Sequence, residues 1–171
     1  MLRKTGQKRI QSSGGVFAIV ASRYNARYVD AMLRAAKTEL NRAGVSKIQV
    51  VRVPGAYEIP VVTAKLARSA SRFTDHASHL SAIICLGVIL RGETVHAAHI
   101  GDAVSRALMD IQLEYEVPVI HEVLLLENES QARARCLGRK YNRGAEAAQT
   151  ALAMAKVMAE LNWIRAVKNH G

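Results

Sequence analysis

A glycine turn followed by a threonine and a histidine is the first feature of this sequence that could carry out chemistry. Gly92, Glu93 and Thr94 stand just before His96, where an amphipathic helical pattern begins. Backbone N–H groups at a helix start, together with the Thr94 hydroxyl, can hold a phosphate on the positive helix end. An imidazole beside that phosphate can move protons near neutral pH. The alternative is structural, because threonine is an ordinary N-cap residue and His96 also fits a capping or surface histidine.

Three other side-chain types could bind a polar, partly aromatic ligand. Glu58 follows a Pro54–Gly55 turn, where a carboxylate can accept hydrogen bonds from sugar or polyol hydroxyls or simply compensate a helix dipole. Tyr24 can stack on a heteroaromatic ring or pack on its own sheet. Arg135 and Arg143 can clamp a phosphate bidentately, or they are solvated helix charges. Taken singly, each of these residues fits either role.

Metal and nucleotide chemistry are less well supported. His96 and His99 are spaced as i and i+3, but no cysteine or acidic residue in that turn supplies a third ligand, so we expect no metal. The sequence lacks the G-x-x-x-x-G-K-[ST] pattern of nucleoside triphosphatases. It also lacks G-x-G-x-x-G after its first apolar run, which argues against a dinucleotide site.

Four apolar runs alternating with helical patterns must position these residues. The runs predict buried strands, and the order of elements is β-α-β-α-β-α-β-α-α. The predicted strands are 16–21, 48–53, 82–90 and 119–126, and the predicted helices are 29–40, 60–66, 100–111, 127–137 and 145–161. Right-handed crossovers then give an α/β fold, a three-layer α/β/α arrangement with a parallel sheet of about four strands. The polar stretch Ser69–Ser78 is interpreted as a surface connection.

In open parallel sheets, ligands bind beyond the carboxyl ends of the strands. Four segments are expected to meet there: Ser22–Asn25, Pro54–Glu58, Arg91–His96 and the stretch from His121 onward. Each contains polar groups that a plain turn would not require.

Length and composition favour one domain. The chain has 171 residues, 50% of them hydrophobic and only 5% aromatic, as expected of a sheet covered by helices. We assign a flexible basic tail to residues 1–14, a single α/β domain to 15–165 and a C-terminal tail to 166–171.

The formal charge of +10 raises the question of nucleic acid binding. Four basic residues crowd the first ten positions, but most others lie singly along predicted helices without interleaved aromatics, so we expect no nucleic-acid partner.

Cys85 and Cys136 form no disulfide or metal pattern, which fits a reducing compartment. No secretory h-region or membrane-spanning run occurs, so we expect a soluble, cytoplasmic protein, although organelle transit peptides share the basic N-terminal bias.

Taken together, these segments resemble the lumazine synthase family. The resemblance rests on five sequence patterns: F-A-I-V with S-R-Y-N at 17–25, V-P-G-A-Y-E-I-P at 53–60, L-G-V-I-L-R-G-E-T-V-H at 86–96, P-V-I at 118–120 and N-R-G-A-E-A-A at 142–148. The likeness runs from about Val16 to Leu161, and the second and third patterns are highly specific in combination. It implies a flavodoxin-like fold and the penultimate step of riboflavin biosynthesis. That step condenses 5-amino-6-(D-ribitylamino)uracil with 3,4-dihydroxy-2-butanone 4-phosphate, without a cofactor or metal.

The resemblance also implies roles for the ambiguous residues. His96 is the acid/base catalyst, and Glu93, Thr94 and Arg135 bind the phosphate. The ribitylaminouracil is held by Tyr24, Ala56, Tyr57, Glu58, His121 and the backbone of Val88, Ile89 and Leu90. Asn25, Gly92 and Arg143 are additional candidates for the site.

The family's assembly carries further expectations. The resemblance implies a homopentamer with active sites between subunits, in which His121 and Arg135 come from the neighbouring chain and an N-terminal strand can join a neighbour. The family also forms decamers and icosahedral shells of sixty chains. The short Gly138–Gly144 connection lacks the insertion that blocks shells, so we expect a shell. Riboflavin synthase is a candidate partner.

This sequence departs from the family pattern at several positions. His121 stands where phenylalanine is usual, Ala97 and Ala98 follow the histidine where aromatic and acidic residues are usual, and Arg143 stands where lysine is common. These differences bear on substrate affinity and pH profile more than on the reaction class.

Two other classes of protein stay open as alternatives. One is a non-catalytic shell or ligand-binding protein that kept the fold, against which the joint presence of Glu58, Thr94, His96 and Arg135 argues. The other is a nucleic-acid-binding protein of flavodoxin type, which salt-dependent binding lost on deleting Met1–Ser13 would favour.

Overall fold

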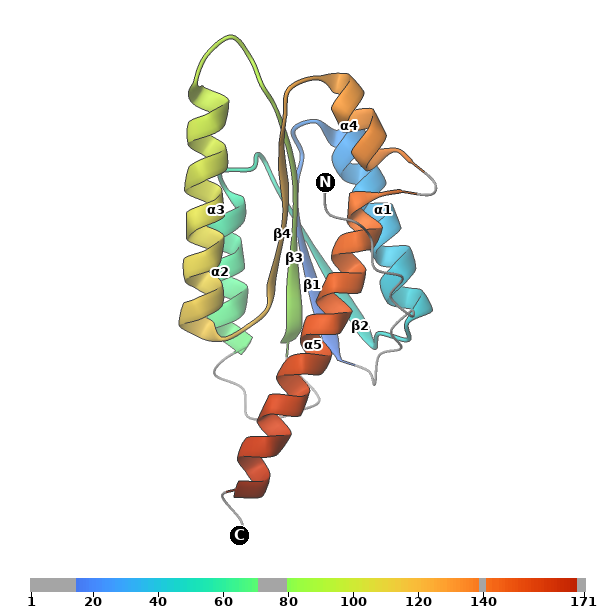
Figure 1. Cartoon of the computed structure of the whole chain (residues 1–171), viewed down its shortest axis with the longest axis vertical. Helices are drawn as coiled ribbons and strands as arrows, with labels where there is room; N and C mark the ends of the chain where they lie inside the picture. The colour runs from blue at the N-terminus through green and yellow to red at the C-terminus, as the bar shows by residue number, and fades with distance from the viewer. Residues whose placement is uncertain (1–14, 71–79, 139–140, 169–171) are drawn as a thin grey trace.

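Four parallel strands form the middle layer of the molecule, and helices cover both faces of the sheet (Figure 1). The computed structural model describes residues 15–70, 80–138 and 141–168. The elements are β1 (Val16–Ser22), α1 (Ala26–Arg42), β2 (Lys47–Val53), α2 (Ile59–Ala70), β3 (Leu80–Leu90), α3 (His96–Tyr115), β4 (Val119–Leu126), α4 (Glu129–Cys136) and α5 (Arg143–Lys168). The predicted element order and three-layer α/β fold are confirmed. The tail at 1–14, most of the Ser69–Ser78 connection and residues 169–171 lie outside the described residues.

The strand order is β2-β1-β3-β4, which places β1 and β3 in the centre of the sheet. Side chains alternate between the two faces because successive residues of a strand point to opposite sides. Phe17 and Ile84 face the core beneath α1, α4 and α5. Val20 and Ile83 face the core beneath α2 and α3. With both faces covered, the two central strands form a rigid base for the loops at their carboxyl ends.

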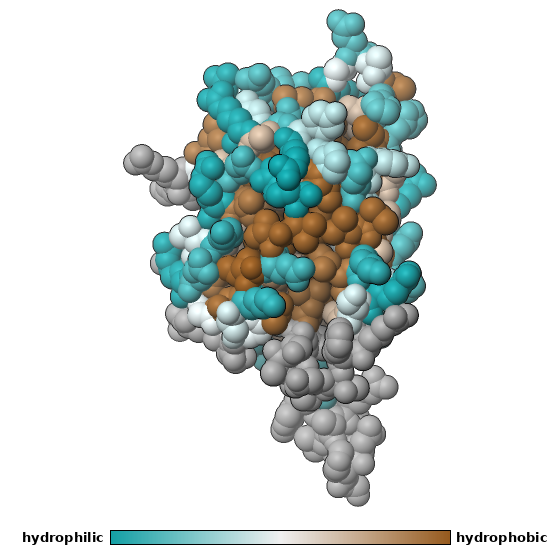
Figure 2. Space-filling view, turned by 180° about the vertical axis from the view of Figure 1, so that it is seen from behind, coloured by the Kyte–Doolittle hydropathy of each residue, from teal (hydrophilic) through white to brown (hydrophobic). Residues whose placement is uncertain are grey.

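The β2 edge of the sheet is much less covered. Most of its side chains are exposed or half-buried, and Val50 is among the exposed apolar residues, as is Val61 on α2. This edge lies at the back of Figure 1, and Figure 2 shows apolar surface across the middle of that side. A parallel edge strand with exposed apolar groups offers unpaired backbone groups to another chain.

The last helix is longer than predicted. α5 begins at Arg143 and continues past the expected end at Leu161 to Lys168, and its last turns project beyond the sheet (Figure 1). No glycine or proline occurs between Ala145 and Lys168, so nothing in the local sequence stops the helix. None of the helices in the described parts of the chain combines the length and hydrophobicity needed to cross a membrane.

Candidate active site

The exits of β1 and β2 are joined by backbone hydrogen bonds. Arg23 N–H donates to the Val53 carbonyl at 2.8 Å, and Tyr24 N–H donates to the Pro54 carbonyl at 3.1 Å. These bonds place Tyr24 beside the turn that follows β2, and the residue is 72% exposed. The predicted meeting of these two segments at the carboxyl edge is therefore confirmed.

Glu58 and Tyr24 approach each other across Gly55. The Gly55 N–H donates to Glu58 Oε2 at 2.8 Å. A Cβ at this position would lie 2.9 Å from Glu58 Oε2 and 3.1 Å from the Tyr24 ring, so the close approach requires glycine. Ala56 is buried below the turn and Tyr57 is exposed. The exposed ring of Tyr24 and the carboxylate of Glu58 are thus brought to the same small surface beside Gly55.

Asn25 links this surface to the end of β3. Its side-chain Nδ2 donates to the Val88 carbonyl at 2.8 Å, and its backbone adopts the left-handed conformation, with φ of 55°, at the start of α1. Asparagine tolerates that conformation better than most residues. Val88 is buried, whereas Ile89 and Leu90 are half-buried. The structure therefore gives Asn25 a local role in linking the end of β1 to the end of β3 through the carbonyl of Val88.

The start of α3 carries the exposed residues of the predicted phosphate turn. Val95 is the N-cap and makes no side-chain cap bond, so the structure does not support the alternative in which Thr94 caps the helix. Glu93, Thr94 and His96 are all exposed. A Cβ at Gly92 would meet nothing within 4 Å, so packing does not explain glycine there. Over residues 15–70, 80–138 and 141–168, no three potential metal-ligating side chains cluster, and this includes the turn with His96 and His99.

His121 does not lie at the carboxyl edge, contrary to our expectation. It pairs with Cys85 in the middle of the sheet, whereas the end of β4 at Leu126 pairs with Leu90. At about 3.3 Å per residue, His121 is roughly 17 Å short of the edge. Its Nε2 lies 2.9 Å from the Ser105 hydroxyl of α3, in a groove of about 320 Å³ between α3 and β4.

Arg135 lies on the opposite side of the sheet from the start of α3. It is exposed in the last turn of α4, which covers the opposite face of the sheet from α3 (Figure 1). Asn128 caps α4 by accepting from the Gln131 N–H at 3.0 Å, and the Gln131 side chain accepts from the Glu127 N–H. This reciprocal capping starts α4 at Glu129, within the predicted Glu127–Ser130 start segment and two residues after the predicted first residue. Within one chain, the sheet thus separates Arg135 from the predicted phosphate turn at the start of α3.

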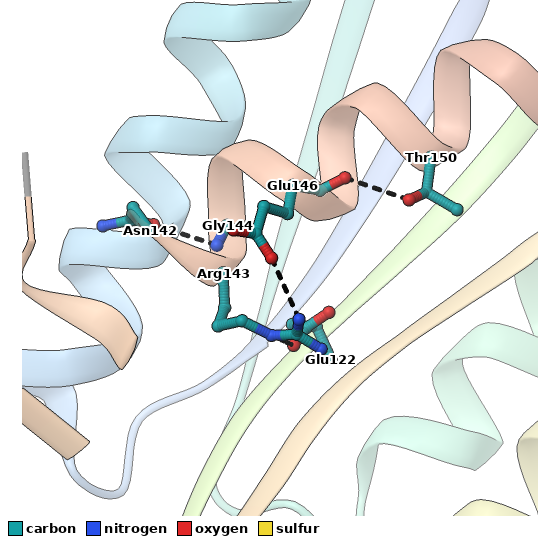
Figure 3. Close-up of polar contacts among 6 residues, drawn as sticks. All are labelled: Glu122, Asn142, Arg143, Gly144, Glu146 and Thr150. Atoms are coloured by element: carbon teal, nitrogen blue, oxygen red, sulfur yellow. Dashed lines mark hydrogen bonds and ion pairs between the residues drawn. The ribbon is translucent and has the colours of Figure 1, made fainter. Parts of the chain in front are cut away.

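Glu122 is a buried charged residue that the sequence analysis missed. Arg143 Nε donates to Glu122 Oε1 at 2.6 Å, and Arg143 Nη1 donates to Glu146 Oε2 at 2.9 Å (Figure 3). Glu122 is only 5% exposed. The available signal was its spacing, because Ile120, Glu122 and Leu124 share one strand face, and both neighbours are apolar. Two donors of Arg143, a candidate phosphate ligand, are therefore taken by carboxylates of its own chain.

Glu122→Gln should make stability less dependent on pH. Burial raises the pKa of Glu122 above the ordinary 4.5, although Arg143 opposes this shift. A raised pKa in the folded state favours folding below the ordinary value, and that contribution is lost as the pH rises through the folded pKa. Wild type should therefore lose stability relative to the variant between acidic and neutral pH, as measured by urea denaturation of both proteins. A wild-type advantage that grows with pH would contradict this prediction.

Comparison with known proteins gives one consistent result. A family model described as 6,7-dimethyl-8-ribityllumazine synthase matches residues 14–159. A protein of that name from Stenotrophomonas maltophilia (strain R551-3) is 41% identical over 147 residues, covering 85% of this chain and 90% of the relative. Proteins of the same name from Xanthomonas oryzae pv. oryzae (strain PXO99A) and Xanthomonas campestris pv. campestris (strain B100) are 41% and 42% identical over 144 residues. Each of these two alignments covers 83% of this chain and 88% of the relative.

Proposed function

The chain belongs to the 6,7-dimethyl-8-ribityllumazine synthase family, and from this premise we propose how its residues carry out the reaction. It is a transferase that condenses 5-amino-6-(D-ribitylamino)uracil with 3,4-dihydroxy-2-butanone 4-phosphate. The products are 6,7-dimethyl-8-ribityllumazine, phosphate and water. The reaction is the penultimate step of riboflavin biosynthesis.

The contact of Tyr24, Gly55 and Glu58 is the observation that best supports our assignment of the pyrimidine site. The exposed Tyr24 ring stacks on the pyrimidine, since an aromatic face is suited to a flat heterocycle. Ala56, Tyr57 and Glu58 hold the ribityl chain, whose hydroxyls can donate to the carboxylate. Backbone groups of Val88, Ile89 and Leu90 bind the heterocycle edge, and Asn25 fixes that strand end through the Val88 carbonyl.

Phosphate binding and proton transfer are assigned to the start of α3. The exposed Glu93–Thr94 turn and the first backbone N–H groups of α3 bind the phosphate. The side chain of the N-cap residue, Val95, accepts no hydrogen bond from these N–H groups, so they are available to an anion. His96, the first residue of α3, accepts and returns protons as the amine condenses with the carbonyl and as phosphate leaves. Most of the acceleration then comes from holding the two substrates together.

We further propose that the site is completed by a neighbouring subunit of a homopentamer. In one chain, His121 lies far from the carboxyl edge and Arg135 lies on the opposite face from α3. Both could complete a neighbour's site while being remote from their own. The exposed apolar β2 edge supports association, including addition of a neighbour's N-terminal strand. The proposal also includes assembly into a 60-subunit shell, riboflavin synthase as a partner, and a cytoplasmic location. The free cysteines support the last of these.

Wild-type protein incubated with the two substrates should form lumazine, detected by its absorbance or fluorescence. The expected result is turnover that depends on both substrates. Absence of turnover by correctly assembled protein would instead favour the non-catalytic shell or ligand-binding alternative.

A further inference from the structure

Asn142 links the two helices on either side of the α4–α5 connection. Its Nδ2 donates to the carbonyl of Cys136, the last residue of α4. Its Oδ1 accepts from the Gly144 N–H at 2.9 Å, in the first turn of α5 (Figure 3). Arg135 directly precedes Cys136, so the end of α4 that carries Arg135 is tied to the start of α5.

The start of α5 is in turn fixed to the sheet. Arg143 Nε is bound to the Oε1 of Glu122 at 2.6 Å, and Glu122 belongs to β4. Because Glu122 is almost fully buried, this carboxylate cannot follow the helix if α5 moves. Glu146 holds Nη1 of the same guanidinium at 2.9 Å. The guanidinium is thereby oriented by two carboxylates from different elements.

Gly144 fixes α5 against α1. A Cβ at Gly144 would overlap the backbone of Met32, including its carbonyl. The two helices are therefore in backbone contact at this point, and glycine is the residue that permits such an approach. With β4 on one side and α1 on the other, the first turn of α5 has little freedom to shift.

Arg135 is also an electrostatic neighbour of this cluster. Burial raises the pKa of Glu122, and the charges of Arg143 and, less strongly, Arg135 lower it. Burial and the charge of Glu122 raise the pKa of Cys136, and the same two arginines oppose that shift. Glu122, Arg135 and Arg143 thus act on one another within one small region.

We propose that Glu122 is a positioning residue for phosphate binding. It holds Arg143, and with it the start of α5. Asn142 carries this constraint to the end of α4, so that Arg135 meets the substrate phosphate in a fixed geometry. The inference rests on the proposed assignment of Arg135 to the phosphate, and it adds a role for a buried carboxylate that does not itself touch substrate.

Glu122→Gln tests this role by removing the charge while preserving the size of the side chain. The KM for the phosphorylated substrate and the inhibition constant of inorganic phosphate should both rise by about tenfold, the order expected when one charge-assisted hydrogen bond is weakened. The KM for ribitylaminouracil should stay unchanged. General structural damage would instead lower the number of active sites without this selectivity. Glu160→Gln is the matched control, because it removes a carboxylate from an exposed ion pair on the same helix as Arg143.

A double-mutant cycle tests whether Glu122 acts through Arg143. If it does, Glu122→Gln combined with Arg143→Met should weaken phosphate binding no more than Arg143→Met alone. Additive effects would overturn the proposal. Asn142→Ala removes the hydrogen bonds that join the end of α4 to the start of α5, without altering a buried charge. It should raise the same two constants, the KM for the phosphorylated substrate and the inhibition constant of phosphate. Unchanged constants in that variant would also overturn the proposal, even if Glu122→Gln failed to assemble.

Arg135→Met separates failure of this inference from failure of the underlying assignment. If Arg135→Met weakens phosphate binding and Glu122→Gln does not, the positioning role is wrong while the phosphate assignment stands. If Arg135→Met leaves the inhibition constant of phosphate unchanged, the assignment itself fails and the positioning role fails with it.

Discussion

His96→Ala should lower kcat by roughly 10²- to 10⁴-fold, the usual contribution of a positioned acid/base group. His96 is the first residue of α3 and is exposed beside the Glu93–Thr94 turn. In the role we propose, its imidazole is accessible to both substrates without first being uncovered. Since the side chain is assigned to proton transfer rather than to binding, the KM values for both substrates should change little. Steady-state kinetics of lumazine formation give these quantities directly.

His99→Ala provides a matched control for this prediction. His99 is an exposed histidine in the same first turn of α3, but it lines a separate surface groove with Asp102 and Arg106. Its replacement should leave kcat close to that of wild type. If His96→Ala and His99→Ala have equally small effects, His96 is an ordinary surface histidine and the proton must be moved by another group.

The sequence was sufficient to predict the layers of this fold because its strands are continuous apolar runs. β1 and β3 are buried on both faces, as such runs indicate. The same logic predicted that Tyr24 and Glu58 would share the carboxyl edge, because each lies in a loop that follows the end of a parallel strand. The backbone bonds between the exits of β1 and β2, and the approach of both side chains to Gly55, confirm that edge prediction. Composition and periodicity alone would not have revealed how closely the two side chains approach.

The errors come from register and from interactions between distant segments. His121 was expected at the edge because it lies in the fourth apolar run, but its height depends on the pairing of β4 with β3, which periodicity does not specify. Glu122 was overlooked because its partner Arg143 is far away in sequence. A charge inside an apolar strand indicates a buried partner, yet it does not say which residue supplies it.

Mixing two impaired variants should restore activity if the active site lies between subunits. One variant is His96→Ala, and the other is Arg135→Met, assayed at a concentration of phosphorylated substrate well below its wild-type KM. In a closed ring, each site would take His96 from one chain and Arg135 from the next. Random mixing in equal amounts then leaves about one quarter of the sites with both native residues. Co-assembled protein should therefore reach about one quarter of wild-type activity per chain, far above either variant alone.

The same mixture distinguishes a shared site from one contained in a single chain. In a single-chain site, every chain lacks one of the two residues, so co-assembly cannot restore activity beyond the average of the two variants. The two variants mixed after separate assembly serve as the control, since intact rings do not exchange the residues of their sites. The position of His121 roughly 17 Å short of the edge, from its pairing with Cys85, favours the shared arrangement. A single-chain site would leave that ring too far away to contact a pyrimidine stacked on Tyr24.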